Sequence, residues 1–423
     1  MSEARFAIGI DLGTTNCVLA AVDLHASEPD KVVDQIEVIP QLTAPGAIEE
    51  RSLMPSFLYL PHPDELRPED RTLPWGNQPP FVVGELARSM GERTPIRLVA
   101  SAKSWLCHPG VDRRTAFLPV EAPEEVERVS PLQATMRYLE HLRAAWDHQH
   151  PQEPLVEQEV VLTVPASFDP AARELTAEAA AAVGLGSHLV LLEEPQAALY
   201  HWILATRGQW RKQVQPGDII LVIDLGGGTA DFSLIAVTER DGSLELVRVA
   251  VGDHILLGGD NMDLALAHTI RAKLAEQGTQ LDLWQLQGLT HGCRGAKEIL
   301  LGDASIKAVP VVVPSRGSRL IGGTLRTELT RDEVTRTLVE GFFPMVEVSA
   351  RPAGRARAAL TKLGLPYAQD AALSRHLAAF LSRQVEATRD LVGFEGRLPK
   401  NASFLHPTAI LFNGGVFKAQ SLL

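Results

Sequence analysis

Two short stretches that share one order of residues constrain this chain more than any other feature of its sequence. The stretch 222–233 reads V-I-D-L-G-G-G-T-A-D-F-S, and residues 7–16 read A-I-G-I-D-L-G-T-T-N. In each, an apolar run typical of a buried strand ends at an acid, Asp11 or Asp224, and glycine and threonine follow. Glycines let the backbone turn its N–H groups toward an anion, and a carboxylate at a strand end suits a hydrated magnesium ion. The pair predicts two half-sites that close on one phosphate chain.

The specificity of this signal comes from the pair. Taken singly, either turn is better explained as an ordinary hairpin, because glycine after a strand usually marks one. Both turns, however, carry the acid, the glycine and the hydroxyl in the same order. Neither is a Walker A loop, G-x-x-x-x-G-K-[ST], nor the G-x-G-x-x-G of dinucleotide folds.

Four segments, taken in order, carry a resemblance to a known family. They are I-G-I-D-L-G-T-T-N at 8–16, V-L-T-V-P-A-S-F-D-P-A-A-R at 161–173, L-L-E-E-P-Q-A-A-L at 191–199 and D-L-G-G-G-T-A-D-F-S at 224–233. The first and last resemble the two phosphate motifs of the DnaK-type seventy-kilodalton heat-shock chaperones. The middle two resemble that family's proline-switch and first connecting segments. The resemblance runs from residue 6 to about residue 416 and so covers nearly the whole chain.

The resemblance implies an α/β protein with the two-lobed actin/hexokinase-like ATPase fold, in which each ribonuclease-H-like lobe is a mixed sheet flanked by helices. Lobe I would span residues 1–206, with an inserted subdomain at about 45–130. Lobe II would span 207–423, with a subdomain at about 260–340. ATP or ADP with Mg²⁺ would bind in the cleft between the lobes.

The resemblance also assigns residues to the phosphate and metal chemistry. Asp11 and Asp224 would hold the magnesium through waters. The cofactor-binding and catalytic groups around the phosphates would be Gly13, Thr14, Thr15, Asn16, Gly226, Gly227, Gly228 and Thr229. Lys103, in S-A-K-S-W-L, would neutralise developing charge and orient the attacking water. A single lysine is ordinarily a solvated surface charge, but its place between two recognisable segments reverses that interpretation.

Further positions follow from the same resemblance. Asp231 would bind a monovalent cation such as K⁺ or order the water, and Glu194 would lie near the metal and nucleotide. The remaining nucleotide contacts would be Gly258, Gly259, Asp260, Lys297, Gly414 and Gly415. Pro165 and Arg173 would relay the nucleotide state to a partner domain, although the sequence alone explains Pro165 better as a strand terminator.

The chain departs from the family pattern at four places. Arg294 stands where the family usually has an acid that holds the ribose, and Glu298 stands where an arginine usually stacks on adenine. The last turn, G-G-V-F-K, lacks the usual Ser/Thr-Arg. These changes put base recognition in doubt. The chain also stops at Leu423, where the family continues with more of lobe II, a linker and a peptide-binding sandwich. We expect either a fragment or a truncated product, with weak or impaired ATP hydrolysis.

Composition excludes several classes of partner. A net charge of −12 argues against nucleic acid or an anionic membrane. No apolar run approaches the length of a bilayer span, and no signal-peptide pattern precedes the first strand. Three scattered cysteines fit a reducing cytoplasm. The histidines at 141, 148 and 150 lack convincing metal spacing.

The function predicted from the sequence is slow ATP hydrolysis that serves as a switch in a chaperone. Its partners would be a peptide-binding domain, unfolded clients, J-domain proteins and nucleotide-exchange factors. Two alternatives share the fold. A small-molecule kinase needs a catalytic base facing a substrate pocket, and no such motif is visible. An actin- or MreB-like filament former would be defined by its surface. Locally, we expect a surface hairpin or loop at 23–50, an exposed insertion at 61–80, and helices at 131–148, 169–183 and 263–277.

Overall fold

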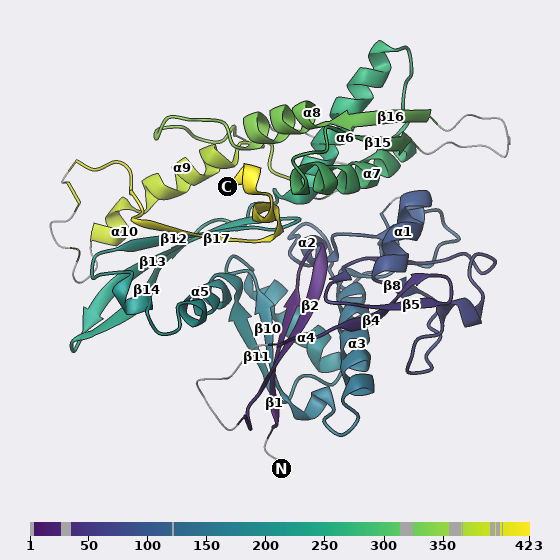
Figure 1. The fold of residues 1–423 in the computed structure, drawn as a ribbon, viewed down its shortest axis with the longest axis horizontal. Coiled ribbons are helices and arrows are strands. Elements are labelled where there is room, and N and C mark those ends of the chain that lie inside the picture. The colour runs from purple at the N-terminus through teal and green to yellow at the C-terminus, as the bar shows by residue number, and fades with distance from the viewer. Residues whose placement is uncertain are drawn as a thin grey trace. The chain divides into compact units, whose positions relative to one another are not determined.

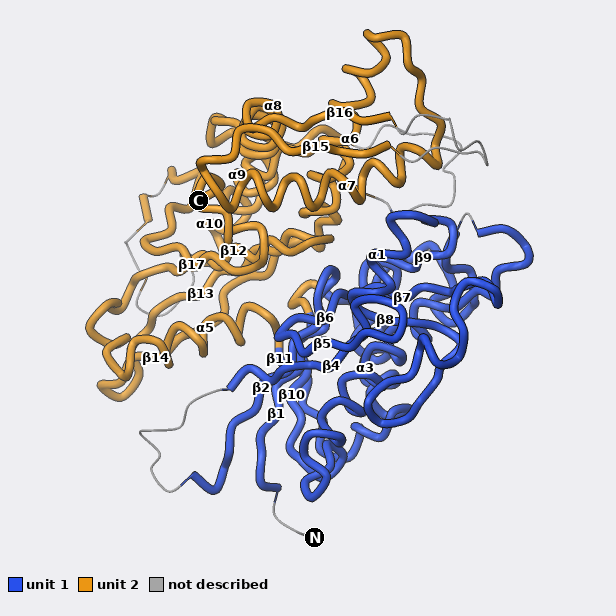
Figure 2. Tube along the Cα trace, turned by 45° about the vertical axis from the view of Figure 1, so that its right-hand side comes forward, with its two compact units in different colours: residues 1–164, 168–192, 363–365 blue, residues 165–167, 193–362, 366–423 orange. Residues whose placement is uncertain are grey.

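The computed structural model of the chain describes residues 4–26, 35–120, 122–313, 325–354, 365, 367–389, 394, 398–399 and 401–423. These residues form two compact units (Figure 2). The first contains residues 1–164, 168–192 and 363–365, and the second contains 165–167, 193–362 and 366–423. The predicted lobe boundary at 206/207 and the two inserted subdomains stay predictions.

The first unit is organised around a mixed sheet whose strand order is β11-β10-β1-β2-β3, with β6 also paired to β2 (Figure 1). Strand β1 pairs in parallel with β10 and antiparallel with β2, so the first turn lies between β1 and β2 at one edge of these strands. The strands are β1 (Phe6–Leu12), β2 (Asn16–Asp23), β3 (Gln35–Ile36), β6 (Met54–Pro55), β10 (Glu159–Val164) and β11 (Leu189–Glu193).

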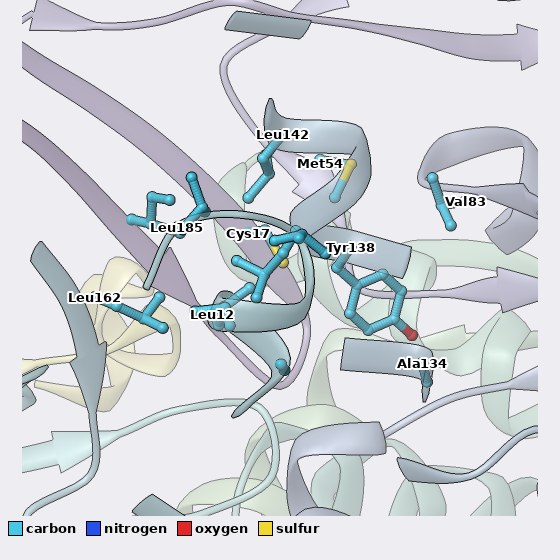
Figure 3. Close-up of a cluster of buried hydrophobic side chains, with 14 of the residues drawn as sticks. Leu12, Cys17, Met54, Val83, Ala134, Tyr138, Leu142, Leu162 and Leu185 are labelled. Carbon is cyan, nitrogen blue, oxygen red and sulfur yellow. The ribbon is translucent and has the colours of Figure 1, made fainter. Parts of the chain in front are cut away.

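Helices α3 (Pro131–Gln149) and α4 (Pro170–Ala182) pack against each other and bury the main core of this unit. Both begin where the sequence predicts, at a capping side chain followed by proline: Ser130 accepts the N–H of Gln133, and Asp169 accepts that of Ala172. Alternate residues of β1 point into the core. Figure 3 shows part of it, with Leu12, Cys17, Met54, Tyr138 and Leu162 among the labelled side chains.

Residues 39–106 of the first unit bear on two predictions. Residues 39–51 form a hairpin with one surface strand: β5 is exposed, whereas β4 is buried from Ile39 to Leu42. Residues 27–34 of the predicted 23–50 segment lie outside the described residues. The segment 61–80 is mostly exposed, as predicted, but Leu66 and Leu73 are buried in an apolar cluster. The elements here are β4 (Ile39–Ala44), β5 (Ala47–Arg51), β7 (Leu58–Tyr59), β8 (Val82–Val83), α1 (Glu85–Arg93), β9 (Leu98–Val99) and α2 (Ala102–Leu106).

The second unit contains a four-stranded sheet in the order β14-β13-β12-β17. Strand β12 pairs antiparallel with β13 and in parallel with β17, which places Asp231 and Asn413 opposite Asp224. The elements are α5 (Glu194–Ala205), β12 (Ile219–Leu225), β13 (Ala230–Arg240), β14 (Ser243–Val251), α6 (Gly259–Glu276), α7 (Leu283–Gly302), β15 (Ala308–Val313), β16 (Leu325–Thr330), α8 (Arg331–Thr335), α9 (Leu373–Arg383), α10 (Val385–Arg389) and β17 (Ala409–Asn413).

Helix α6 begins four residues earlier than predicted, because Asn261 accepts the N–H of Gly258 and caps it. The helices expected between 345 and 405 are α9 and α10, and the rest of the insertion expected there lies partly outside the described residues. None of the helices in the described part of the chain is long and apolar enough to cross a membrane.

Candidate functional site

The first turn, residues 13–15, is held from one side by Ser56. Its hydroxyl donates to the Gly13 carbonyl at 2.7 Å, and its backbone N–H donates to the Thr15 carbonyl at 2.8 Å. The Thr15 hydroxyl is buried and has no hydrogen-bond partner among the described residues. Buried polar atoms of folded proteins nearly always have a partner. This orphaned hydroxyl therefore fits an added oxygen ligand such as a phosphate.

Asp11 lies at the carboxyl end of β1 beside Thr163 of β10, its partner in the parallel register. The Thr163 hydroxyl donates to Asp11 Oδ1 at 2.7 Å. Asp11 itself is exposed to solvent. An exposed carboxylate with one oxygen oriented by a hydroxyl suits a cation that keeps its waters.

Lys103 and the first turn line the same pocket within the first unit. The pocket holds about 390 Å³ of empty space, and Gly13, Ser56 and Phe168 are among its other lining residues. The Lys103 ammonium lies 6.0 Å from the centroid of the Phe168 ring. Cys17 also lines this pocket, but burial raises the pKa of its thiol to about 12, so it is not a nucleophile at neutral pH. The structure thus brings the predicted catalytic lysine to the predicted phosphate turn.

The second turn presents two buried carboxylates side by side. Asp224 and Asp231 are cross-strand partners and are 8% and 5% exposed. Asp231 Oδ1 accepts a hydrogen bond from the Ser167 hydroxyl and lies 3.4 Å from His254 Nδ1. Its Oδ2 is buried without a hydrogen-bond partner among the described residues. Two adjacent buried carboxylates are costly unless a cation compensates them, so this pair fits a bound cation.

No group of three or more histidine, cysteine, aspartate or glutamate side chains is arranged as a metal site in the part of the chain that the structure describes. A cation at Asp224 and Asp231 would therefore complete its shell with water or with oxygens of a ligand.

The amino-terminal end of α6 rests directly on the second turn. The N–H groups of Gly259 and Asp260 donate to the carbonyls of Gly226 and Gly227 at 3.1 and 2.7 Å. A Cβ at Gly258 would come within 2.7 Å of those same two carbonyl oxygens. Only glycine at position 258 allows this approach.

Strand β17 holds Asp224 from the other side. Asn413 Nδ2 donates to Asp224 Oδ2 at 2.9 Å. Gly414 follows with a φ of +95°, and a Cβ there would lie 2.9 Å from Asp224 Oδ1. Gly415 begins a short 3₁₀ turn. The structure therefore brings the predicted residues Gly414 and Gly415 to the second turn.

Helix α7 is tied to α6 by a buried network of four charged residues. Arg294 contacts Asp260 at 2.5 Å and Asp263 at 2.9 Å, and Lys297 contacts Asp263 at 2.7 Å and the Gly259 carbonyl at 3.2 Å. Burial alone would lower the pKa of Arg294, but the two carboxylates hold it above its ordinary value. Asp260 and Lys297, both predicted to bind nucleotide, are thus engaged in ion pairs within the unit.

Three further predicted residues lie outside the two turns. Glu194 is the first residue of α5, Pro165 is buried directly after β10, and Arg173 lies on α4. Glu194 sits at a helix amino terminus, where the helix dipole favours a negative charge. Their catalytic and switching roles stay predictions.

Three residues around the second turn were not predicted from the sequence. Ser167 and His254 contact Asp231, and Asn413 contacts Asp224. Asn413 could have been found, because it ends an apolar run before two glycines, just as Asp224 does. Ser167 and His254 carry no such signal, since 87 positions separate them and only the fold joins them.

Comparison with known proteins places these features in a family. The family model described as "Hsp70 protein" matches residues 79–351. Proteins described as "Chaperone protein HscA homolog" are similar over most of the chain. Those of Bordetella pertussis, Cupriavidus necator and Pseudomonas fluorescens are each 30% identical, over 366, 365 and 368 residues. These alignments cover 84%, 83% and 84% of this chain, and 50%, 50% and 49% of the relatives. The chain spans about half the length of the curated relatives it matches.

Proposed function

Since the chain belongs to the Hsp70 family, we propose that it is the ATP-binding and slowly ATP-hydrolysing part of a chaperone. Membership confirms the predicted fold class, a two-lobed ATPase fold of the actin and hexokinase type. The observation that carries the proposal is the second turn, where a glycine-rich backbone adjoins two buried carboxylates, Asp224 and Asp231. A magnesium–phosphate ligand supplies both the cation and the anion that such a turn suits.

Each turn has a role in this proposal. Asp11 and Asp224 hold Mg²⁺ through waters, and the orphaned oxygen of Asp231 takes a monovalent cation such as K⁺ or orders water. The backbone of both turns, with the hydroxyls of Thr15 and Thr229, holds the β- and γ-phosphates. When bound, Mg²⁺ neutralises phosphate charge. Lys103 orients water at the γ-phosphate and opposes the charge that develops there.

Base recognition is expected to be weak. Arg294 is committed to Asp260 and Asp263, and Lys297 to Asp263, so these side chains hold the helices together. A charged hydrogen bond to the ribose or base is worth roughly 1.5–3 kcal/mol, and its loss reduces discrimination. In competition with labelled ATP, we expect the concentration of GTP needed for displacement to be within about tenfold of the concentration of unlabelled ATP needed.

The proposed chaperone role also involves residues outside the two turns. Pro165 and Arg173 transmit the nucleotide state to a peptide-binding domain, which acts on unfolded clients with J-domain and exchange-factor partners. The three cysteines, all among the described residues, are buried and form no disulfide, which supports a reducing cytoplasm. A small-molecule kinase and a filament former are not favoured by the comparisons.

The proposal is tested by calorimetry of ATP binding to the 423-residue chain with Mg²⁺ and with EDTA, followed by single-turnover hydrolysis. Magnesium-dependent binding and slow release of phosphate to water are expected. A phosphorylated small-molecule acceptor would instead identify a kinase, and ATP-dependent pelleting would identify a filament. If ATP does not bind in the presence of Mg²⁺, the assignment of the two turns is wrong.

A further inference from the structure

A second pocket in the first unit lies where the 61–81 segment meets helix α3. It holds about 480 Å³ of empty space, partly open to solvent, and shares no lining residue with the Lys103 pocket. Arg71, Leu73, Trp75 and Phe81 line it from the segment, and Arg137 and His141 line it from α3. The segment is mostly exposed, but these side chains form one wall of a pocket against the unit.

The walls of this pocket are aromatic and well supported. The Trp75 ring meets the His141 ring edge-on, with centroids 5.1 Å apart, and the Arg137 guanidinium lies 4.8 Å from the centroid of Phe81. Leu73 beside them is buried. Each contact has a geometry that stabilises aromatic side chains in one orientation. The apolar surface is therefore already formed before any ligand arrives.

Among the described residues one charge in the pocket lacks a counterion, although the carboxylate of Glu140 also lines the pocket. Arg137 pairs with Glu140 at 2.8 Å. His141 Nε2 contacts the Pro40 carbonyl at 2.9 Å, and burial lowers its pKa to about 4, so it is neutral at neutral pH. Arg71 donates from Nη1 to the Pro79 carbonyl at 2.6 Å, which is a neutral acceptor.

Among the described residues no carboxylate pairs with Arg71, and its Nε is buried without a hydrogen-bond partner. Arg71 is half-buried, and arginine is the side chain whose geometry best matches a carboxylate. An incoming carboxylate would supply the missing counter-charge to its guanidinium.

From this charge and these walls we propose that the pocket binds a small organic carboxylate with a planar apolar body. The carboxylate pairs with Arg71, and the body lies against Trp75 and Leu73. The site is distinct from the nucleotide turns and does not depend on the function proposed for them. A ligand with one aromatic ring suits the partly open, aromatic-lined pocket.

The probe is phenylacetate, compared with its neutral analogue phenylacetamide and the cation 2-phenylethylamine. Binding to the 423-residue chain is followed by saturation-transfer NMR and calorimetry. Phenylacetate is expected to bind with a Kd of about 1 mM or tighter, which is reasonable for so small a ligand. The amide and the amine should bind at least about tenfold more weakly, because neither can form the charged pair with Arg71.

Arg71→Gln should weaken phenylacetate at least about tenfold and leave the amide unchanged, because only the charge and its donors are lost. Arg67→Gln is the matched control, since Arg67 is four residues away, three-quarters exposed and outside the pocket. It should bind phenylacetate as the wild type does. Thermal melting verifies that both variants fold.

Three results would overturn the proposal: no phenylacetate binding below about 10 mM, equal affinity for acid and amide, or unchanged acid affinity in Arg71→Gln. A lower melting temperature with unchanged acid affinity would show that Arg71 only fastens the segment through Pro79. If Arg71→Gln does not fold, the comparison of acid and amide on the wild-type chain still decides the question.

Discussion

The two phosphate turns share one order of residues but are built into opposite settings. Asp11 is exposed and is oriented by one hydroxyl, that of Thr163. Asp224 is 8% exposed, receives the amide of Asn413, and lies beside the equally buried Asp231. A short motif therefore specifies which groups are present, while the surrounding packing determines how much each group costs to keep charged.

The lysines predicted beside each turn differ in the same way. Lys103 lines a pocket with Gly13, whereas Lys297 is buried in an ion pair with Asp263. The first is placed for contact with a ligand, and the second holds two helices together. Mutations should separate these roles, because one should change chemistry and the other stability.

The largest effect is expected at Lys103. If this lysine acts mainly in the transition state, as proposed, Lys103→Ala should lower single-turnover ATP hydrolysis a hundredfold or more while leaving nucleotide affinity and melting temperature nearly unchanged. Lys212→Ala, an exposed lysine of the second unit, is the control. Normal hydrolysis by Lys103→Ala would show that this lysine takes no part in the mechanism. The proposed difference between a catalytic Lys103 and a structural Lys297 would then be wrong.

Next is Lys297→Met, which should destabilise the chain by about 3 kcal/mol in urea unfolding. The substitution leaves Asp263, only 1% exposed, with Arg294 as its one remaining cation. The control is Lys273→Met, which breaks the more exposed pair with Glu333 and should cost about 1 kcal/mol or less. If both variants lose equal stability, the buried network does not hold α6 to α7 as described.

Acid should destabilise both units by a similar route. Burial lowers the pKa of His141 in the first unit to about 4, and burial with the neighbouring Arg294 does the same for His291 in the second. In the unfolded chain the imidazole has its ordinary pKa of 6.5, so the unfolded state binds the proton first as the pH falls. Stability is therefore full above pH 6.5 and is lost as the pH falls toward 4.

From this pKa shift, the contribution of His141 should lower the free energy of unfolding by about 2 kcal/mol between pH 7 and pH 5. His141→Gln, which can still donate to the Pro40 carbonyl, should remove that part of the pH dependence, and His291→Gln should remove its own. Urea unfolding at the two pH values measures both. A pH dependence that neither variant changes would contradict this account.

The smallest effect compares the two carboxylates directly. Asp11→Asn and Asp224→Asn should each weaken magnesium-dependent ATP binding about tenfold, since each removes one charge that faces the cation. Only Asp224→Asn should also raise the melting temperature without ligand, because it relieves the repulsion of Asp231. Asp23→Asn, at the other end of β2, should change neither. Unchanged affinity in both turn variants would mean that the site is misassigned.

Part of this architecture was predictable because it depends on local order along the chain. Strand, acid, glycine and hydroxyl occur together in both turns, and the capping residues of α3 and α4 stand directly before proline. The resemblance built on those turns also predicted the family, which the comparisons confirm. The segment 61–80 is mostly exposed, as its prolines and charges indicated, but they did not reveal that Leu66 and Leu73 pack inward.

The sequence by itself determined the two turns, because backbone conformation and the chemistry of each turn are set by neighbouring residues. Only the tertiary structure decided how those turns are supported. It paired Arg294 with Asp260 and Asp263, brought Ser167 to Asp231, and left Arg71 in a pocket with no carboxylate partner among the described residues. Burial and electrostatic pairing depend on side chains that are distant along the chain, and a local motif contains no information about which of them will meet.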